Sequence, residues 1–276
     1  MKIVNLMDNL AGAAGCLCEH GLSYYIETKN HKLLMDTGAS AQFLENAKML
    51  GIDLTAVDTV FLSHGHYDHA GGILPFAGVN KTAKIYLQKG AVKEYYSVKL
   101  GQEKYIGINP DIRNLPQIEW IDGDKKLDEE LEVFSNVTGR KLWPKDNLTL
   151  KRKEAEGYVQ DEFDHEQYLV ISCEGKKILV SGCAHNGILN ILDAYRSRYG
   201  GDPDVIISGF HMMKRTGYDE TDVALIRETA ETFAKTDIKL YTGHCTSEPA
   251  YLIMKEILGS QIVWVHSGDC ITFEQY

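Results

Sequence analysis

Apolar positions along the chain follow two periods, which divide it into strand and helix segments. Short apolar runs bounded by Gly, Asp or Asn indicate strands, and apolar residues that repeat every three or four positions indicate helices. Two pairs of apolar runs joined by polar turns predict β-hairpins over 21–36 and 168–183. Further strands are expected at 2–7, 57–62, 204–210, 238–243, 262–266 and 270–273, and helices at 40–50, 187–199, 220–235 and 247–258.

The order of these elements predicts the fold class. A hairpin opens each half of the chain, and alternating strands and helices close it. This order is typical of an α/β protein in which two mixed β-sheets lie between helices. The first helix should begin with Ser40 as its N-cap and end at Gly51, where glycine favours termination.

We expect one domain over residues 1–276, because no linker, repeat or low-complexity tract divides the chain. The segment 84–160 is less regular and is predicted to form a variable, cap-like part of this domain. It contains the strand-like runs IYLQ, IEWI and LEVFSNV. Its charged stretch 143–160 is predicted to be a loop.

The charge balance restricts the possible partners. With 29 basic and 39 acidic residues, the formal net charge is −10. An acidic surface repels phosphates, so a large nucleic-acid interface is not expected. No run of 18 apolar residues occurs, and we therefore expect no membrane span. The expected partner is a small-molecule substrate.

Cysteine usage and the N-terminal segment favour a cytoplasmic location. The segment 1–16, MKIVNLMDNLAGAAGC, ends like a lipoprotein cleavage site, but Asn5, Asp8 and Asn9 interrupt its apolar run. Export is therefore not expected. The cysteines show no regular framework and no Cys-x-x-Cys pair, which is typical of a reduced chain. They are Cys16, Cys18, Cys173, Cys183, Cys245 and Cys270.

The segment FLSHGHYDHAGG, at 61–72, carries the most specific chemistry. His64, His66, Asp68 and His69 lie directly after a predicted strand. Imidazole and carboxylate are the ligands of hydrolytic zinc sites, and also of Mn²⁺ or Fe²⁺ sites. His64 and His66 can point to the same side of an extended turn, whereas the adjacent Asp68 and His69 point differently. Four ligands arranged in this way suit two metal ions better than one.

The sequence HGHYDH at 64–69 matches the His-x-His-x-Asp-His signature of the metallo-β-lactamase superfamily, and the sequence DTG at 36–38 matches its Asp-x-Gly. The chain resembles this superfamily over nearly its whole length. The resemblance implies an αββα sandwich with a dinuclear metal site at one edge. Within the superfamily, the chain resembles the dihydropterin-ribofuranosylaminobenzene phosphate synthase-like subgroup. The matching pieces lie at 19–23, 63–69, 181–187, 209–211 and 243–246.

The resemblance implies further ligands at the ends of later strands. His244 follows the predicted strand 238–243 and fits the last histidine of the set. The usual bridging aspartate is replaced by Cys183, which either binds metal, as in some members, or is a buried thiol. His185 faces the same way as Cys183 on an extended chain. His165 lies close to where the remaining histidine is expected. We favour His185, because the subgroup keeps its Gly-Cys-x-His more regularly.

The leading functional hypothesis is a dinuclear metal-dependent hydrolase. Two divalent ions, Zn²⁺ in preference to Fe²⁺ or Mn²⁺, would hold a bridging hydroxide that attacks an ester, lactone or phosphoester of a small molecule. Asp68 would bind one metal and orient the hydroxide. His211, at the end of the predicted strand 204–210, would contact the substrate or transfer a proton.

Three alternatives use the same metal site. The chain could be a pterin-related synthase of the methanopterin-biosynthesis type, or a metal-binding module without turnover. Redox chemistry of the flavodiiron kind is disfavoured, because the ligand set is short of carboxylates. Around the motif, His20 could orient a metal ligand through its other ring nitrogen. Tyr67 inside the motif, and Tyr95, Tyr96 and Tyr105 in the irregular segment, either line a pocket or pack within a loop-rich cap.

Overall fold

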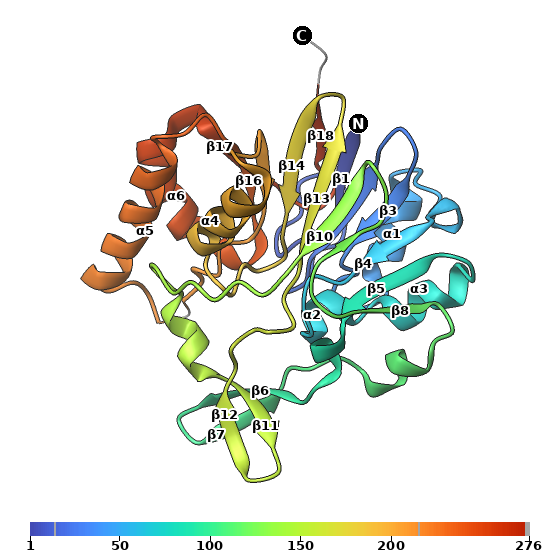
Figure 1. Ribbon diagram of the computed structural model, residues 1–276, viewed down its shortest axis with the longest axis horizontal. Coiled ribbons are helices and arrows are strands. Elements are labelled where there is room, and N and C mark those ends of the chain that lie inside the picture. The colour runs from blue at the N-terminus through green and yellow to red at the C-terminus, as the bar shows by residue number, and fades with distance from the viewer. Residues whose placement is uncertain (14, 215, 274–276) are drawn as a thin grey trace.

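The computed structural model describes residues 1–13, 15–214 and 216–273. Within these residues, the strands form two seven-stranded β-sheets and one four-stranded sheet (Figure 1). The first large sheet has the order β18-β1-β2-β3-β4-β5-β8, with β1 (Lys2–Met7), β2 (Ser23–Glu27), β3 (Lys32–Met35), β4 (Thr59–Phe61), β5 (Lys84–Gln88), β8 (Ile118–Ile121) and β18 (Cys270–Thr272). The second has the order β17-β16-β15-β14-β13-β10-β9, with β9 (Lys125–Lys126), β10 (Leu131–Phe134), β13 (Tyr168–Cys173), β14 (Lys176–Val180), β15 (Val205–Ile207), β16 (Lys239–Thr242) and β17 (Ile262–Trp264).

Both large sheets change from antiparallel to parallel pairing partway across. In the first, β1, β2 and β3 pair antiparallel, and β3, β4, β5 and β8 pair parallel. In the second, β10, β13 and β14 pair antiparallel, and β14 to β17 pair parallel. Parallel neighbours need a crossover connection, which helices usually supply. The helices are α1 (Gln42–Met49), α2 (Tyr67–Ala70), α3 (Ile73–Val79), α4 (Ile188–Tyr199), α5 (Glu220–Phe233) and α6 (Glu248–Leu258).

Apolar side chains fill the space between the two large sheets. Ile3 and Leu33 of the first sheet share one buried cluster with Leu169 and Ile178 of the second. A separate buried cluster packs α1, through Phe43, against the outer face of the first sheet. The alternation of side chains along each strand therefore supplies one core between the sheets and another beneath the helices.

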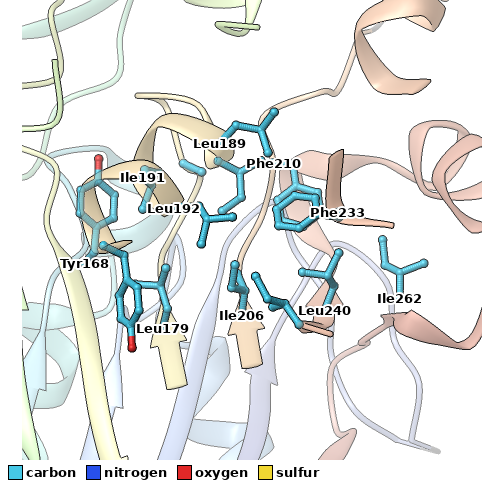
Figure 2. Close-up of a cluster of buried hydrophobic side chains, with 14 of the residues drawn as sticks. Tyr168, Leu179, Leu189, Ile191, Leu192, Ile206, Phe210, Phe233, Leu240 and Ile262 are labelled. Atoms are coloured by element: carbon cyan, nitrogen blue, oxygen red, sulfur yellow. The ribbon is translucent and has the colours of Figure 1, made fainter. Parts of the chain in front are cut away.

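The outer face of the second sheet is covered by α4, α5 and α6. Leu179, Ile206 and Leu240 come from three consecutive strands, and they lie in one cluster with Leu192 of α4 and Phe233 of α5 (Figure 2). Burial of each such side chain stabilises the fold by about 1.5–3 kcal/mol. Two mixed sheets with helices on both outer faces confirm the predicted αββα sandwich.

The first helix is present, but its predicted N-cap is wrong. The helix begins at Gln42 after Ala41, and no side chain caps it. Ser40 lies one residue before the N-cap position; its hydroxyl accepts a hydrogen bond from the Gln42 amide at 3.2 Å and donates to Glu19 Oε2 at 2.7 Å. The helix ends before Gly51, whose φ of 68° is in the left-handed region, as predicted for a terminating glycine.

The prediction of a loop over 143–160 is wrong. A short 3₁₀ helix over Lys145–Thr149 leads into the hairpin of β11 (Leu150–Glu154) and β12 (Gly157–Gln160). This hairpin pairs with β6 (Tyr95–Lys99) and β7 (Gln102–Tyr105) in the order β12-β11-β6-β7, set apart from the large sheets (Figure 1). Most of its side chains are exposed, so the alternating apolar pattern that reveals a strand is missing.

The last two strands belong to different sheets. β17 pairs parallel with β16 in the second sheet, whereas β18 pairs antiparallel with β1 in the first. The C-terminal segment thereby connects the two layers of the sandwich. Among the helices of the described residues, none combines the length and the apolar character needed to cross a bilayer.

An ion-pair cluster around His31 links the two large sheets and predicts a pH-dependent stability. His31 Nδ1 lies 3.1 Å from Asp58 Oδ1, and His31 Nε2 lies 2.8 Å from Asp128 Oδ2. His31 and Asp58 directly precede β3 and β4 of the first sheet, and Asp128 lies in the loop before β10 of the second. Burial by itself lowers the pKa of His31, but the hydrogen bonds to Asp58 and Asp128 outweigh it and raise the pKa above the usual 6.5. This stabilisation is therefore fully present below pH 6.5 and is lost as the pH rises through the folded-state pKa.

We expect His31→Ala to reduce the free energy of unfolding by about 1 kcal/mol at pH 5.5, and by less at pH 9. Chemical denaturation at the two pH values measures the difference. Equal losses at both values would show that the charge of His31 does not contribute.

Candidate metal centre

The predicted metal ligands gather where strands of both large sheets end, at one edge of the sandwich. The segment 64–69 follows β4 of the first sheet. Cys183 and His185 follow β14 of the second sheet, and His244 follows β16. The carboxyl ends of parallel strands are where α/β sheets place ligand-binding residues. All the predicted ligands are buried: His64, His66, Asp68, His69, Cys183, His185 and His244.

The structure brings most of these side chains into two compact sets that share one member. The first consists of His64, Cys183 and His185, and the second of His69, Cys183 and His244. Within each set, the possible ligand atoms lie within 4.8 Å of one another. His69 Nε2 is 3.2 Å from Cys183 Sγ. Cys183 therefore lies where a ligand common to two metal ions would be needed.

Asp68 lies beside the second set. Its Oδ2 is 3.5 Å from His244 Nε2 and 3.8 Å from His69 Nε2. His20 approaches the same oxygen at 3.3 Å, and its ring stacks on that of His244, with 5.1 Å between centroids. His20 thus contacts the predicted ligand Asp68 and packs against one face of the His244 ring.

The distances between nitrogen atoms fit a bound metal ion. His64 Nε2 and His185 Nε2 are 3.3 Å apart, and His66 Nε2 is buried without a hydrogen-bond partner among the described residues. A tetrahedral ion with metal–nitrogen bonds of about 2.0–2.1 Å holds two nitrogens roughly 3.3–3.4 Å apart. Three imidazoles and a thiol are also donors that zinc accepts.

Asp36 fixes the orientation of two rings. Its Oδ2 lies 2.6 Å from His69 Nδ1 and accepts a hydrogen bond from Ser63 Oγ at 2.7 Å. Ser63 Oγ lies 2.8 Å from His64 Nδ1. When His69 Nδ1–H donates to Asp36 and His64 Nδ1–H donates to Ser63, the Nε2 atom of each ring keeps a free lone pair for a metal ion. The Asp-x-Gly match therefore lies directly behind the predicted ligands.

Two asparagines that the sequence did not single out hold two further histidines in the same way. Asn147 Oδ1 lies 3.0 Å from His185 Nδ1, and Asn147 Nδ2 donates to the His185 carbonyl at 2.7 Å. Asn9 Oδ1 lies 2.9 Å from His244 Nδ1, and Asn9 Nδ2 donates to the His244 carbonyl at 3.3 Å. Each asparagine thus leaves the Nε2 of its histidine facing the other ligands.

We expect Asn147→Ala to weaken metal binding about 10- to 100-fold, because the His185 ring would lose the contact that orients it. Competition with a chromogenic chelator measures this affinity. Asn30→Ala, in an exposed turn, serves as the control and should leave it unchanged. An unchanged metal affinity in Asn147→Ala would show that the two contacts of Asn147 with His185 do not position the His185 ring.

The structure distinguishes His165 from His185. His165 Nδ1 accepts a hydrogen bond from the Gly65 amide at 2.9 Å, and its Nε2 lies 3.2 Å from Asp161 Oδ2. Both ring nitrogens of His165 are therefore in use, whereas His185 Nε2 faces His64. His165 and Asp161 also form a compact group with His66. The hydrogen bonds favour His185 as the ligand, and the assignment stays a prediction.

The environment keeps the rings of His64, His66 and His185 neutral. Burial and the neighbouring histidines lower the pKa of His64 and His185 well below the usual value, and that of His66 to about 3. Burial also lowers the pKa of His244, but the hydrogen bond to Asp68 outweighs it and raises this pKa to about 9. His244 therefore carries a proton when no metal is bound, and an ion entering the second set displaces that proton.

His211 and Cys245 form the remaining side of the centre. Together with Cys183 they make another compact group, and the His211 amide donates to Cys245 Sγ at 3.3 Å. His211 has a positive φ of 49°, a strained conformation for a non-glycine residue. Both of its ring nitrogens are buried and lack hydrogen-bond partners among the described residues. Cys245 was not predicted as a site residue, although it lies within the segment 243–246 that matches the subgroup.

A cavity of about 240 Å³ opens onto this centre. His66, Tyr67, Asp68 and Cys183 are among the residues that line it. Tyr95 instead packs in a small buried cluster, and its hydroxyl donates to the Gly90 carbonyl at 2.8 Å. Among the tyrosines considered from the sequence, Tyr67 therefore lines the pocket and Tyr95 has a packing role.

Comparison with known proteins identifies the class of protein to which this fold and site belong. A sequence model of the metallo-β-lactamase superfamily matches residues 17–140. A crystal structure of a metal-dependent hydrolase of the β-lactamase superfamily, Tm1679, aligns over 100% of both chains with a TM-score of 0.83 and 27% identity. Both matches agree with the resemblance to the metallo-β-lactamase superfamily that the motif indicates.

Individual relatives differ in what they are reported to do. The chain is 27% identical to the 7,8-dihydropterin-6-methyl-4-(β-D-ribofuranosyl)-aminobenzene-5'-phosphate synthase of Methanocaldococcus jannaschii, covering 99% of this chain and 97% of that protein. Zn²⁺-bound PqqB from Methylobacterium extorquens has the same fold, with a TM-score of 0.60 and 14% identity over 99% of this chain and 100% of that chain. The first similarity extends over nearly the whole sequence, and the second shows a shared fold alone. The chemistry of this chain is therefore argued from its own site.

Proposed function

We propose that this protein is a dinuclear metal-dependent hydrolase that cleaves an ester, lactone or phosphoester of a small molecule. The observation that carries the proposal is the pair of ligand sets that share Cys183, a residue that lines a cavity. A cavity of about 240 Å³ can hold a small molecule but not a folded macromolecule. The net charge of −10 also disfavours a nucleic-acid substrate.

In this proposal, the first set binds one ion together with His66, and the second set binds another together with Asp68. Two divalent ions, zinc in the first place, would lower the pKa of a water molecule toward neutrality and stabilise the charge that develops on a carbonyl or phosphoryl oxygen. Asp36 and Ser63 hold ligand rings in the required tautomers.

Asp68 and His211 have the proposed catalytic roles. The pKa of Asp68 is held below its usual value, because nearby histidines outweigh the effect of burial, so Asp68 is a carboxylate at neutral pH. It can accept a hydrogen bond and orient a water molecule beside the second set. His211 lines the cavity with its ring nitrogens unpartnered among the described residues. It can therefore hold a proton at a ring nitrogen and donate it to the leaving group.

Hydrolysis of a panel of small phosphoesters and lactones tests the proposal. We expect activity in the untreated protein, loss after treatment with a chelator, and recovery when Zn²⁺ is restored. The folded state of the chelated sample is checked by circular dichroism. Undiminished hydrolysis in a sample shown to be metal-free would contradict the proposal.

A pterin-related synthase is the second candidate. It is supported by the 27% identity to the M. jannaschii synthase over 99% of this chain. In that case the same ligands would serve a bond-forming step. In such a step the arylamine nitrogen would displace a leaving group from the 6-methyl carbon of the pterin. Mass spectrometry of the products, after incubation with a ribofuranosylaminobenzene phosphate and a dihydropterin that carries a leaving group at this carbon, distinguishes the two candidates. A new joined product would favour the synthase, and hydrolysis products alone would favour the hydrolase.

A further inference from the structure

The four-stranded sheet contributes one wall of the cavity above the candidate metal centre. Ser97 and Lys99 of β6, Lys104 of β7 and Leu150 of β11 line the cavity, together with Ile106. His66, Asp68, Cys183 and His185 line the same cavity. A ligand in the cavity can therefore contact both the metal-binding residues and this small sheet.

Lys104 supplies a positive charge to this wall. Its Nζ donates to the Tyr67 hydroxyl at 3.3 Å and lies 4.8 Å from the centre of the Tyr67 ring. No ion pair to a carboxylate is formed by Lys104 within the part of the chain that the structure describes. Lys99 differs, because Asp146 Oδ2 lies 2.8 Å from its Nζ and compensates its charge. Lys104 is thus an uncompensated cation facing the cavity of an acidic protein.

Two hydroxyl groups accompany this charge. Ser97 and Lys104 are directly opposite each other in the β6–β7 pairing, so their side chains lie on the same face of the sheet. The Tyr67 hydroxyl is within hydrogen-bond distance of Lys104 Nζ. Ammonium and two hydroxyls together present several donors, which match the acceptor oxygens of a phosphate monoester.

We propose that Lys104, Ser97 and Tyr67 form an anion subsite that binds a phosphate monoester group of the substrate. The reacting bond would lie at the other end of the molecule, over the metal-binding residues. That second statement rests on the proposed hydrolase function, whereas the binding of the anion by Lys104 does not. The subsite makes a phosphorylated small molecule the preferred substrate over its uncharged analogue.

Isothermal titration of the purified protein with phenyl phosphate, and with benzyl alcohol as the uncharged probe, tests the subsite. The protein is first treated with a chelator, so that the probe neither binds metal ions nor is hydrolysed. We expect phenyl phosphate to bind and benzyl alcohol to bind far more weakly. Lys104→Gln should weaken phenyl phosphate binding at least about tenfold, because a charged hydrogen bond is lost. High salt should weaken the binding to wild type and have less effect on Lys104→Gln.

Lys153→Gln is the matched control. Lys153 lies in the same sheet, 5.7 Å from the centre of the Tyr96 ring, but it does not line the cavity. Its replacement should leave phenyl phosphate binding unchanged. Metal content is measured in each variant, so that a failure of the metal centre is recognised separately. Wild-type affinity in Lys104→Gln, or no binding of phenyl phosphate to wild type, would overturn the subsite.

Discussion

Replacing His185 with alanine is expected to remove one metal ion from the protein and to lower the rate of hydrolysis about 10³-fold or more. The His185 ring supplies the nitrogen that faces His64 Nε2 at 3.3 Å. Without it, the first set keeps too few donors for a closed site. Loss of one ion removes several kcal/mol of transition-state stabilisation, and each 1.36 kcal/mol corresponds to a factor of ten in rate. Elemental analysis and steady-state kinetics measure both effects.

His165→Ala is the matched control for this prediction. His165 is also buried, but its ring nitrogens bind the Gly65 amide and Asp161. We expect this variant to keep its metal ions and to lose about 1–3 kcal/mol of stability, because buried polar partners are left unsatisfied. If His165→Ala loses a metal ion and His185→Ala does not, the two ligand assignments are reversed.

The second large effect is expected at Cys183. Because both ligand sets contain Cys183, its replacement by alanine should weaken both metal sites and lower hydrolysis by about 10³-fold. Cys183→Asp should keep two ions, because a carboxylate can also bridge two metals. The comparison of metal content between Cys183→Ala and Cys183→Asp is the measurement.

The alternative for Cys183 gives the opposite result. If the thiol only packs in the core, Cys183→Ala should retain both ions, and the buried charge of Cys183→Asp should destabilise the fold. Thermal denaturation of both variants therefore accompanies the metal analysis. Two ions in Cys183→Ala would remove Cys183 from the ligand set.

The parts of the site that were predictable from the sequence are those encoded locally. His64, His66, Asp68 and His69 lie within one turn, so their spacing alone indicates a metal site. The strands that position them have continuous apolar runs, because both faces of each are covered. The clear periodicity of both hairpins and of the helices likewise predicted two mixed sheets between helices, and the superfamily resemblance implied the αββα sandwich.

The site residues that were not predicted from the sequence contact histidines that are far away along the chain. Asn9 and His244 are 235 positions apart in the chain, and the residues around neither of them indicate that the two side chains are in contact. Asn147 lies in the stretch 143–160, whose exposed, charged strands lack an apolar pattern. The choice between His165 and His185 needed a complete account of hydrogen bonds, which only the three-dimensional arrangement supplies.

Metal content per chain in the wild-type protein tests the central claim most directly. Elemental analysis is made on protein purified without added metal, and again after incubation with Zn²⁺ and removal of the excess. Two ligand sets that share Cys183 predict about two ions per chain after incubation. One ion or none would contradict a dinuclear centre.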